Sequence, residues 1–357
     1  MTMTIAGYPV GPDSPPMVIA EISGNHKQSL DRALQMVEAA ARSGAHAIKL
    51  QTYTADTMTL PSNDEAYIIK SRRSPWFGRN LYELYQEAHT PWEWHQPIFE
   101  YAKKLGIGAF SSAFDTTAVE FLESIGTPAY KVASFESSDV RLLETIARTG
   151  KPVVLSCGMA LLSEIRRAVS TLREAGSTTI VLLKCTSDYP AEPSESNLST
   201  IVALQKEFGC EVGLSDHTLG TTVAVAAVAL GASLIEKHFT LDKNDSAIDS
   251  SFSADPEELK RLVNETRTSW VSKGSISYGP TSSEKESRYY RRSLYAAKVI
   301  KENEIIRDDA LISLRPALGI DSGEIDAVIG CRAKQVIEAG DPIKTGDLLV
   351  DDAPNKK

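Results

Sequence analysis

The sequence predicts an α/β fold in which a (β/α)8 TIM barrel is followed by a small β-rich domain. Eight short apolar runs alternate with amphipathic helical patterns, a rhythm typical of barrels of about 250 residues. No glycine-rich dinucleotide fingerprint follows any run, so a closed barrel is favoured over a doubly wound open sheet. The alternation ends near residue 275, and the second domain therefore lies at the C-terminal end.

The predicted strands are apolar almost throughout, rather than alternating between apolar and polar residues. The runs "VVLSC" and "IVLLKC" are typical. This pattern indicates strands that are covered on both faces, as in a barrel with helices outside. The predicted strands span residues 17–22, 47–51, 108–112, 130–134, 153–157, 180–185, 211–216 and 234–239.

The segments between the strands have helical periodicity. The first of them places Leu30, Leu34 and Val37 on one face. It begins at a plausible cap, Ser29, and ends at Gly44. Similar patterns follow in "TPWEWHQPIFEYAKKLG", "DTTAVEFLESIG", "DVRLLETIARTG", "LLSEIRRAVSTLREAG", "SNLSTIVALQKEFG", "TTVAVAAVALGA" and "PEELKRLVNETRTSWV".

An insertion at residues 52–89 makes the step from the second strand to the third about twice as long as the other steps. Loops of this length inside compact domains are usually functional, and many of them are lids. Two interpretations of this insertion stay open. It is either a lid over the site or a solvent-exposed addition without a role there.

The C-terminal part predicts a separate module. Residues 1–278 form the predicted barrel domain with an N-terminal extension, 279–291 a linker and 292–351 the β-rich domain. A module of about 60 residues has a small hydrophobic core, so we expect contact with a partner to stabilise it. The basic stretch "RYYRRSLY" favours a solvated hinge over an RNA-binding surface.

Composition excludes several classes of protein. The net charge of -9 argues against general nucleic-acid binding, which needs basic patches. No apolar run approaches eighteen residues and the start lacks a secretory layout, so we expect a cytoplasmic protein without a membrane segment. The four widely spaced cysteines contain no Cys-x-x-Cys pair and favour reduced, packed thiols.

Polar side chains gather where the predicted strands end. In a TIM barrel the carboxyl ends of the strands form the active-site face. A single serine there is usually bonded to nearby backbone, but polar groups at the end of every strand predict a site. These residues are Glu21, Lys49, Gln51, Ser111, Ser112, Lys131, Ser134, Ser156, Lys184, Ser187, Tyr189, Ser215, Asp216, His217, Glu236 and His238.

His217 and His238 end the seventh and eighth strands and are candidate metal ligands. Neighbouring strands are about 4.8 Å apart, so both rings can reach one ion at about 2.1 Å. Glu21 follows on the adjoining first strand. Two imidazoles leave positions open for water and substrate, which favours Mn²⁺ or Mg²⁺ as a Lewis acid over structural zinc. Packed histidines without metal are the alternative.

Lys49 and Lys131 end the second and fourth strands, where an unpaired buried ammonium would be costly. An anionic substrate is one partner for them, and serines on the same rim supply donors for phosphate or carboxylate oxygens. The alternative is a structural network in which the lysines pair with Glu136 and Glu21.

Several motifs in order resemble the sialic acid synthase family over nearly the whole chain. They are "AEISGNH", "IKLQTYT", "FSSAFD", "YKVASFE", "LLKCTSDYP", "GLSDHT", "IEKHFTLD" and the C-terminal "SLYAAKVIKENE" with "SLRP". The resemblance implies a metal-dependent enzyme that condenses phosphoenolpyruvate with an amino sugar. It identifies the tail as similar to the antifreeze-like (SAF) domain of that family.

Roles follow from the resemblance position by position. His217 and His238 would bind the metal, and Glu21 would lie near the aldehyde and the metal-bound water. Family members often carry asparagine at Ser187. The tail of one subunit would reach the barrel of the other in a domain-swapped homodimer, with Arg315 contacting an N-acetyl group. The remaining substrate-binding residues would be Lys49, Lys131, Ser134, Ser156, Ser187, Ser215 and Glu236 for phosphoenolpyruvate, and Tyr189 and Asp249 for the sugar.

Three features resemble the branch of the family that uses a 6-deoxy diacetamido sugar: "QTYT", "LYELYQEAHTPWEWH" and Phe135. A phenylalanine would add apolar surface beside a sugar that lacks a hydroxyl. Ala113 departs from the family, which usually has proline there, so loop rigidity is expected to differ. The branches that make sialic or legionaminic acid, and a noncatalytic sugar-phosphate binding protein, are the alternatives.

Overall fold

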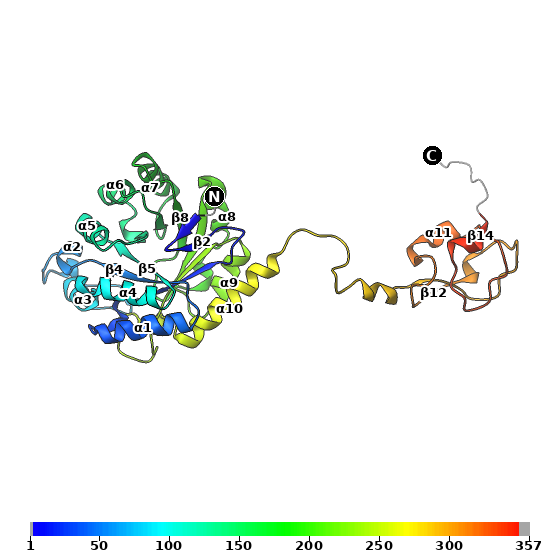
Figure 1. Cartoon of the computed structure of the whole chain (residues 1–357), viewed down its shortest axis with the longest axis horizontal. Coiled ribbons are helices and arrows are strands. Elements are labelled where there is room, and N and C mark those ends of the chain that lie inside the picture. The colour runs from blue at the N-terminus through cyan, green and yellow to red at the C-terminus, as the bar shows by residue number, and fades with distance from the viewer. Residues whose placement is uncertain (1–2, 350–357) are drawn as a thin grey trace. The chain divides into compact units, whose positions relative to one another are not determined.

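The computed structural model describes residues 3–349, which fold into two units with separate cores (Figure 1). The chain divides between Gly274 and Ser275. The boundaries at 278 and 291 stay predictions, and residues 350–351 of the predicted second domain lie outside the described residues. No helix in the described part is long and apolar enough to cross a membrane.

Eight parallel strands close into a barrel in the first unit, in the order β10-β3-β4-β5-β6-β7-β8-β9. Every strand predicted from the sequence is present, and the barrel prediction is confirmed. β6 ends earlier than expected because Ser134 begins a short 3-10 helix. The strands are β3 (Met17–Glu21), β4 (Ala47–Thr52), β5 (Gly108–Ala113), β6 (Tyr130–Val132), β7 (Val153–Ser156), β8 (Ile180–Cys185), β9 (Glu211–Asp216) and β10 (Leu234–His238).

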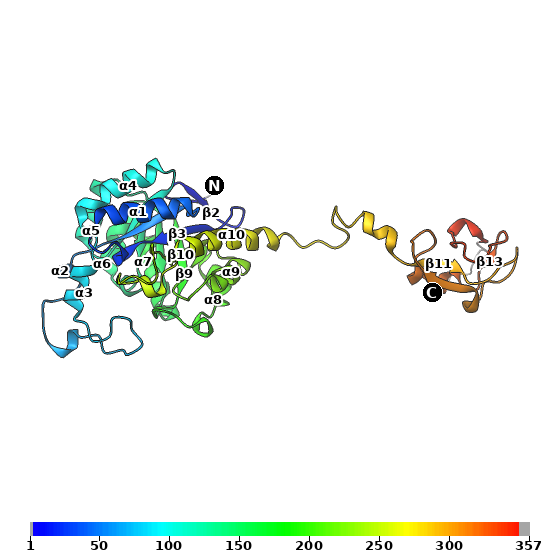
Figure 2. The ribbon, with the colours of Figure 1, turned by 90° about the horizontal axis from the view of Figure 1, so that it is seen from below.

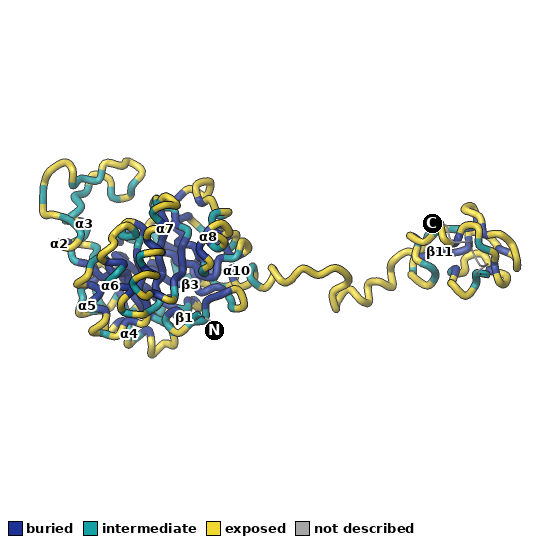
Figure 3. The backbone as a smooth tube through the Cα atoms, turned by 90° about the horizontal axis from the view of Figure 1, so that it is seen from above, coloured by how far each residue is buried: buried dark blue, intermediate teal, exposed yellow. Residues whose placement is uncertain are grey.

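Alternate residues of most barrel strands enter two different cores, which explains the continuous apolar runs. In β3, Met17 and Ile19 join the cluster inside the barrel, while Val18 and Ala20 join the layer under the helices. Because both faces are covered, the strands are buried along their length, as Figure 3 shows. Burial of about 25 cal/mol per Å² of apolar surface makes these two layers the main stabilising feature.

A hairpin of β1 (Met3–Ile5) and β2 (Tyr8–Val10) packs at the amino ends of the barrel strands. Its Ile5 and Val10 join the interior cluster. The approach is so close that a Cβ on Gly108, the first residue of β5, would lie 2.7 Å from the carbonyl oxygen of Ala6. Glycine is therefore required at the start of β5.

Helices surround the barrel where the periodicity predicts them (Figure 1). The predicted cap of the first helix is confirmed, since Ser29 Oγ accepts a hydrogen bond from the Arg32 N–H. Gly44 follows its end with φ +87°, which favours glycine. The helices are α1 (Leu30–Arg42), α4 (His95–Lys104), α5 (Thr116–Ser124), α6 (Val140–Arg148), α7 (Leu162–Glu174), α8 (Thr200–Phe208), α9 (Thr222–Ala229) and α10 (Pro256–Lys273).

The insertion at residues 52–89 follows β4 and contains its own short elements (Figure 2). They are α2 (Ala55–Met58), a 3-10 helix η2 (Glu65–Tyr67) and α3 (Leu81–Ala88). Asn80 caps α3 through its side-chain oxygen, and Leu84 is the residue of that helix that is buried. The remaining 3-10 helices of the first unit are η1 (Ser23–His26), η3 (Trp92–Trp94), η4 (Ser134–Glu136), η5 (Pro193–Glu195) and η6 (Ser250–Phe252).

The second unit begins with an exposed segment, residues 275–292, that contains the 3-10 helix η7 (Glu286–Tyr290). Two small sheets follow, so the predicted β-rich character is confirmed. A compact cluster that includes Leu294, Ile306 and Ile343 forms its core. Its elements are β11 (Ser293–Ala296), η8 (Asp308–Ala310), β12 (Leu311–Leu314), η9 (Ser322–Glu324), α11 (Ile325–Val328), β13 (Arg332–Ala333), η10 (Thr345–Asp347) and β14 (Leu348–Leu349).

Candidate active site

The inward-facing positions of the barrel strands change from apolar to polar toward the carboxyl ends. Along β10 the inward sequence is Leu234, Glu236 and His238, where Leu234 belongs to the interior cluster. In β3 it is Met17, Ile19 and Glu21. Strand alternation thus turns most of the predicted polar residues toward a common centre at one end of the barrel. Ser111, Lys184 and Asp216 lie on the other face of their strands, which joins the layer under the helices.

A charged network fills the bottom of this site. It consists of Glu21, Lys49, Lys131 and Glu236, and all four side chains are buried. Lys49 contacts the Glu21 carboxylate, and its Nζ lies 3.8 Å from Glu236 Oε2. Lys131 Nζ lies 3.5 Å from Glu236 Oε1. The pairing alternative is therefore seen in part, with Glu236 as the partner of Lys131 in place of Glu136.

Within the charged network, neighbouring charges shift the pKa values of the side chains. Burial raises the pKa of the Glu236 carboxyl, but the Lys131 and Lys49 ammoniums outweigh it and hold the pKa to about 2. Burial lowers the pKa of Lys49, and the Glu21 and Glu236 carboxylates reverse this and raise it. For Lys131, burial outweighs the nearby Glu236 carboxylate and lowers the pKa of the ammonium.

Two serines and a glycine form a small cradle above the charged network, which we call the serine cradle: Ser134, Gly158 and Ser187. The Gly158 N–H donates to Ser134 Oγ at 3.1 Å. A Cβ on Gly158 would lie 2.2 Å from Ser187 Oγ and 2.7 Å from Ser134 Oγ. Only glycine leaves both hydroxyls free to turn toward a ligand.

Further hydroxyls lie on the same rim. Ser156 Oγ is buried without a hydrogen-bond partner, which is costly unless a ligand supplies one. Ser215 Oγ donates to Glu236 Oε1 at 3.2 Å, and Ser112 Oγ accepts from Lys49 Nζ at 2.8 Å. The predicted phosphoenolpyruvate-binding residues are thus brought together.

His217 and His238 lie beside each other, with ring centroids 5.4 Å apart. His217 Nδ1 lies 2.8 Å from the Thr186 carbonyl oxygen, and as a donor there it leaves Nε2 with a free lone pair. His238 Nδ1 is buried without a hydrogen bond and lies 3.6 Å from Asp249 Oδ2.

A divalent ion fits this arrangement of residues. One imidazole is oriented by a backbone carbonyl, and the other has an unsatisfied buried nitrogen. Among residues 3–349, no group of three His, Cys, Asp or Glu side chains is preassembled for a metal. Any ion bound by these two histidines would therefore keep open positions for water and substrate, and this suits Mn²⁺ or Mg²⁺.

Tyr189 and Phe252 cover the two histidines. The Tyr189 ring centroid lies 4.3 Å from His217, and the Phe252 centroid lies 5.1 Å from His238. Burial raises the pKa of the Tyr189 hydroxyl well above its usual range, so it stays a neutral hydrogen-bonding group. With Asp249 beside His238, the two predicted sugar contacts lie on the same side of the site as the candidate metal ligands.

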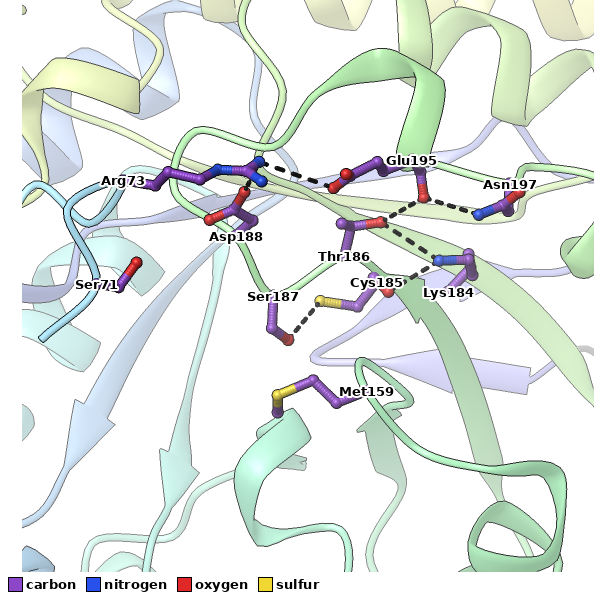
Figure 4. A pocket seen from close by; sticks show the side chains of 10 residues that line it. All are labelled: Ser71, Arg73, Met159, Lys184, Cys185, Thr186, Ser187, Asp188, Glu195 and Asn197. Carbon is purple, nitrogen blue, oxygen red and sulfur yellow. Dashed lines mark hydrogen bonds and ion pairs between the residues drawn. The ribbon is translucent and has the colours of Figure 1, made fainter.

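A cavity of about 610 Å³ opens next to Ser187 (Figure 4). Arg73 and Ser71 reach it from the insertion, and Met159 reaches it from the loop after β7. Arg73 Nη2 lies 2.6 Å from Asp188 Oδ2, so an ion pair connects the insertion to the loop after β8. The insertion thus borders the site through Ser71 and Arg73. The length of the insertion did not predict which of its residues would lie there.

Glu136 differs from the other acidic residues at the mouth. It lies in η4, and its Oε2 atom is buried without a hydrogen-bond partner. Burial outweighs the nearby Lys131 ammonium and raises the pKa of this carboxyl to about 7. Its protonation therefore changes within the physiological range.

Asp216 points away from the site, although it stands beside His217 in the sequence. Its carboxylate accepts a hydrogen bond from the Thr218 N–H at 3.0 Å and forms a buried ion pair with Lys237, with Nζ 2.7 Å from Oδ2. Strand alternation explains this, because Ser215 and Glu236 face inward. Asp216 thus has a structural role, and the sequence reasoning missed its partner Lys237.

The roles predicted for two further residues stay predictions. Phe135 follows Ser134 but is 63% exposed. Arg315 belongs to the second unit, where it is exposed, and its predicted role at a partner's barrel stays a prediction. Sequence reasoning missed Gly158 and Trp76. A glycine directly after a strand and an aromatic residue within a long insertion were the available signals.

Comparison with known proteins gives matches along most of the chain. The NeuB family matches residues 36–278, and the SAF domain matches residues 291–349. Pseudaminic acid synthase of Helicobacter pylori is 42% identical over 94% of this chain and 98% of its own length. N,N'-diacetyllegionaminic acid synthase of Legionella pneumophila is 37% identical over 90% of this chain and 92% of its own length.

A solved structure shares the fold. N-acetylneuraminic acid synthetase of Leptospira borgpetersenii superposes with a TM-score of 0.72 at 33% sequence identity. The match covers 80% of this chain and 95% of that protein.

Proposed function

The chain belongs to the NeuB family, and from that premise we propose that it is a pseudaminic acid synthase. It would condense phosphoenolpyruvate with 2,4-diacetamido-2,4,6-trideoxy-altrose to give pseudaminic acid and phosphate. The observation that carries this proposal is 42% identity to a pseudaminic acid synthase over 94% of the chain, against 37% to a legionaminic acid synthase.

Phosphoenolpyruvate would bind across the charged network and the serine cradle. Lys49 and Lys131 present buried ammoniums, and a carboxylate or phosphate can share them with Glu21 and Glu236. Ser134 and Ser187 leave their hydroxyls open around Gly158, and Ser156 adds a hydroxyl without a partner. The residues thus offer both charged and neutral donors to the carboxylate and the phosphate of phosphoenolpyruvate.

His217 and His238 would hold Mn²⁺ or Mg²⁺. Each lysine of the charged network already lies near a glutamate, so a cation at the histidine pair would add attraction for a trianionic substrate. When bound, the ion would polarise the aldehyde oxygen of the sugar as a Lewis acid. The Thr186 carbonyl holds the His217 ring so that its Nε2 faces the site.

Glu21 would move the protons of the reaction. Its carboxylate is held by Lys49 and accepts from the Ser23 N–H at 3.0 Å, so its position is fixed. In the proposed reaction, C3 of phosphoenolpyruvate forms a bond to the aldehyde carbon, water adds at C2, and the C2–O bond to phosphate breaks. Glu21 can take a proton from that water and pass it to the former aldehyde oxygen, which becomes a hydroxyl. The C2 hydroxyl then loses its proton to the departing phosphate, and C2 becomes a ketone.

The sugar would lie between Tyr189 and Asp249. Both side chains flank the histidine pair, as a sugar whose aldehyde faces that pair requires. Phe135 would add apolar surface at the mouth, since it is largely exposed and follows Ser134 of the serine cradle.

We further propose that the protein acts as a domain-swapped homodimer in the cytoplasm. The second unit has a small core, and Arg315 on its surface would complete the site of a partner subunit. All four cysteines are free thiols, as expected in a reducing compartment.

Phosphate release from phosphoenolpyruvate is the test of the proposed activity. The trideoxy altrose sugar, its legionaminic acid counterpart and N-acetylmannosamine are compared, each with Mn²⁺ and with a chelator. We expect release with the altrose sugar in the presence of metal. Release with another sugar alone would assign the enzyme to a sister branch, and no release with any of them would favour the noncatalytic alternative.

A further inference from the structure

A tryptophan from the insertion reaches the aromatic side chains of the site. The Trp76 ring centroid lies 5.4 Å from Tyr189 and 6.0 Å from Phe252. Those two rings contact each other at 5.2 Å and cover the histidine pair. Trp76, Tyr189 and Phe252 together form what we call the aromatic wall. Trp76, which follows β4 in the chain, thereby contacts the two rings that cover both candidate metal ligands.

The indole N–H of Trp76 fixes a second segment. It donates to the Ile248 carbonyl oxygen at 3.1 Å, and Ile248 directly precedes Asp249. The Asp249 N–H in turn donates to the buried Asn25 side chain at 3.1 Å. Through packing and one hydrogen bond, Trp76 therefore contacts Tyr189 and the backbone beside Asp249, the two residues assigned to the sugar.

The chemistry of this wall favours an apolar part of the ligand. Because the only polar atom of the indole is bonded to Ile248, the Trp76 ring can offer only apolar surface. A methyl group packed there loses water without losing a hydrogen bond. A hydroxyl in the same place would be desolvated without a partner, which disfavours it.

We propose that Trp76 is a specificity-determining residue, and that the aromatic wall packs against the 6-deoxy end of the sugar. This inference rests on the proposed function, which it extends to the choice between deoxy and hydroxylated sugars. It gives the insertion a role in selecting the sugar. Neither the length of the insertion nor the chemistry of the reaction indicates this role.

The neighbouring residue provides a matched control. Phe77 is 52% exposed, and its ring faces the Arg72 guanidinium at a distance of 6.0 Å. Phe77→Ala removes an aromatic ring from the same loop without touching the aromatic wall. Trp76→Phe keeps a ring but cannot donate to Ile248, so it separates packing from the hydrogen bond.

The experiment compares kcat and KM for the 6-deoxy sugar and its 6-hydroxy analogue. In Trp76→Ala we expect the KM for the deoxy sugar to rise about tenfold or more, and the preference over the hydroxy analogue to fall by about 10- to 100-fold. The KM for phosphoenolpyruvate should stay within about twofold. Trp76→Phe should keep most of the preference, and Phe77→Ala should match the unaltered enzyme. An unchanged preference in Trp76→Ala overturns the inference, as does an equal loss in Phe77→Ala.

A binding measurement separates this inference from the proposed function. Each sugar is titrated into the full chain with phosphoenolpyruvate present, and tryptophan fluorescence is compared with that of Trp76→Phe. A fluorescence change that depends on Trp76, without turnover of the deoxy sugar, would count against the synthase proposal and support the role of Trp76. Absence of such a change for every sugar overturns the role of Trp76, whatever the turnover.

Discussion

Lys131 Nζ lies 3.5 Å from Glu236 Oε1, and both side chains are almost fully buried. Lys49 also approaches the Glu236 carboxylate, so removing Glu236 leaves the Lys131 ammonium without its partner. Such a loss in a buried network usually costs about 3–5 kcal/mol. The same carboxylate also accepts from Ser215.

Glu236→Gln should therefore lower the free energy of unfolding by about 3 kcal/mol. Urea unfolding at pH 7 measures this. Glu144→Gln is the control, because Glu144 pairs with Arg148 on an exposed helix face and should change stability by less than about 0.5 kcal/mol. Equal effects of the two substitutions would refute the importance of burial.

Gly158→Ala should weaken phosphoenolpyruvate binding. Its Cβ would displace the hydroxyls of Ser187 and Ser134. Hydrogen bonds to charged groups contribute about 1.5–3 kcal/mol each, so the KM for phosphoenolpyruvate should rise roughly 10- to 100-fold, with the sugar KM little changed. Gly346→Ala, where the added Cβ meets nothing within 4 Å, serves as the control. Unchanged kinetics in Gly158→Ala would contradict the serine cradle.

His217→Ala and His238→Ala should each abolish metal-dependent turnover. Losing one of two protein ligands should reduce Mn²⁺ affinity at least about 100-fold. The free-ion EPR signal during a Mn²⁺ titration measures this independently of activity. His89→Ala, outside the site, should bind metal normally. Full metal-dependent activity in His217→Ala would show that the assignment is wrong.

Glu136 should make stability depend on pH. Burial raises its pKa from 4.5 to about 7, so the folded protein holds this proton to a higher pH than the unfolded chain does. The free energy of unfolding should therefore fall as pH rises from about 4.5 to about 7. Glu136→Gln should remove this dependence and be more stable by about 3 kcal/mol at pH 8, with no difference near pH 4. Urea unfolding across this range tests the sign, with Glu144→Gln as the control.

Arg315 can be tested by complementation. If it acts on the barrel of a partner subunit, Arg315→Ala and His217→Ala are each inactive, but a mixed dimer contains one intact site. Co-expression of the two variants should then restore roughly a quarter of the activity. Arg307→Ala, also in the second unit, should be active when it is expressed alone, without a second variant. Failure to recover activity in mixed dimers of proven composition would exclude the exchange.

The sequence predicts the barrel well because its signals are local. The continuous apolar runs and the Ser29 cap depend on neighbours in the chain, and all eight strands form as expected. The hairpin β1–β2 escaped prediction because strands of three residues have too little periodicity to be recognised.

The sequence predicts which residues lie near the site, but it predicts less well which of them form ion pairs with one another. Strand alternation places Glu236 and His238 inward, whereas nothing local distinguishes Glu236 from Glu136 as the partner of Lys131. The contact of Trp76 with Tyr189 joins residues more than a hundred positions apart through an irregular loop. Such loops have no period from which the direction of a side chain can be inferred.

The hairpin β1–β2 covers the amino ends of the barrel strands, so the site is reached from their carboxyl ends. Ile5 and Val10 add to the side chains that fill the barrel below the site, so the proposed substrates and products would all pass through the carboxyl-end opening. In the proposed reaction, a phosphate that stayed at the serine cradle would block binding of the next phosphoenolpyruvate.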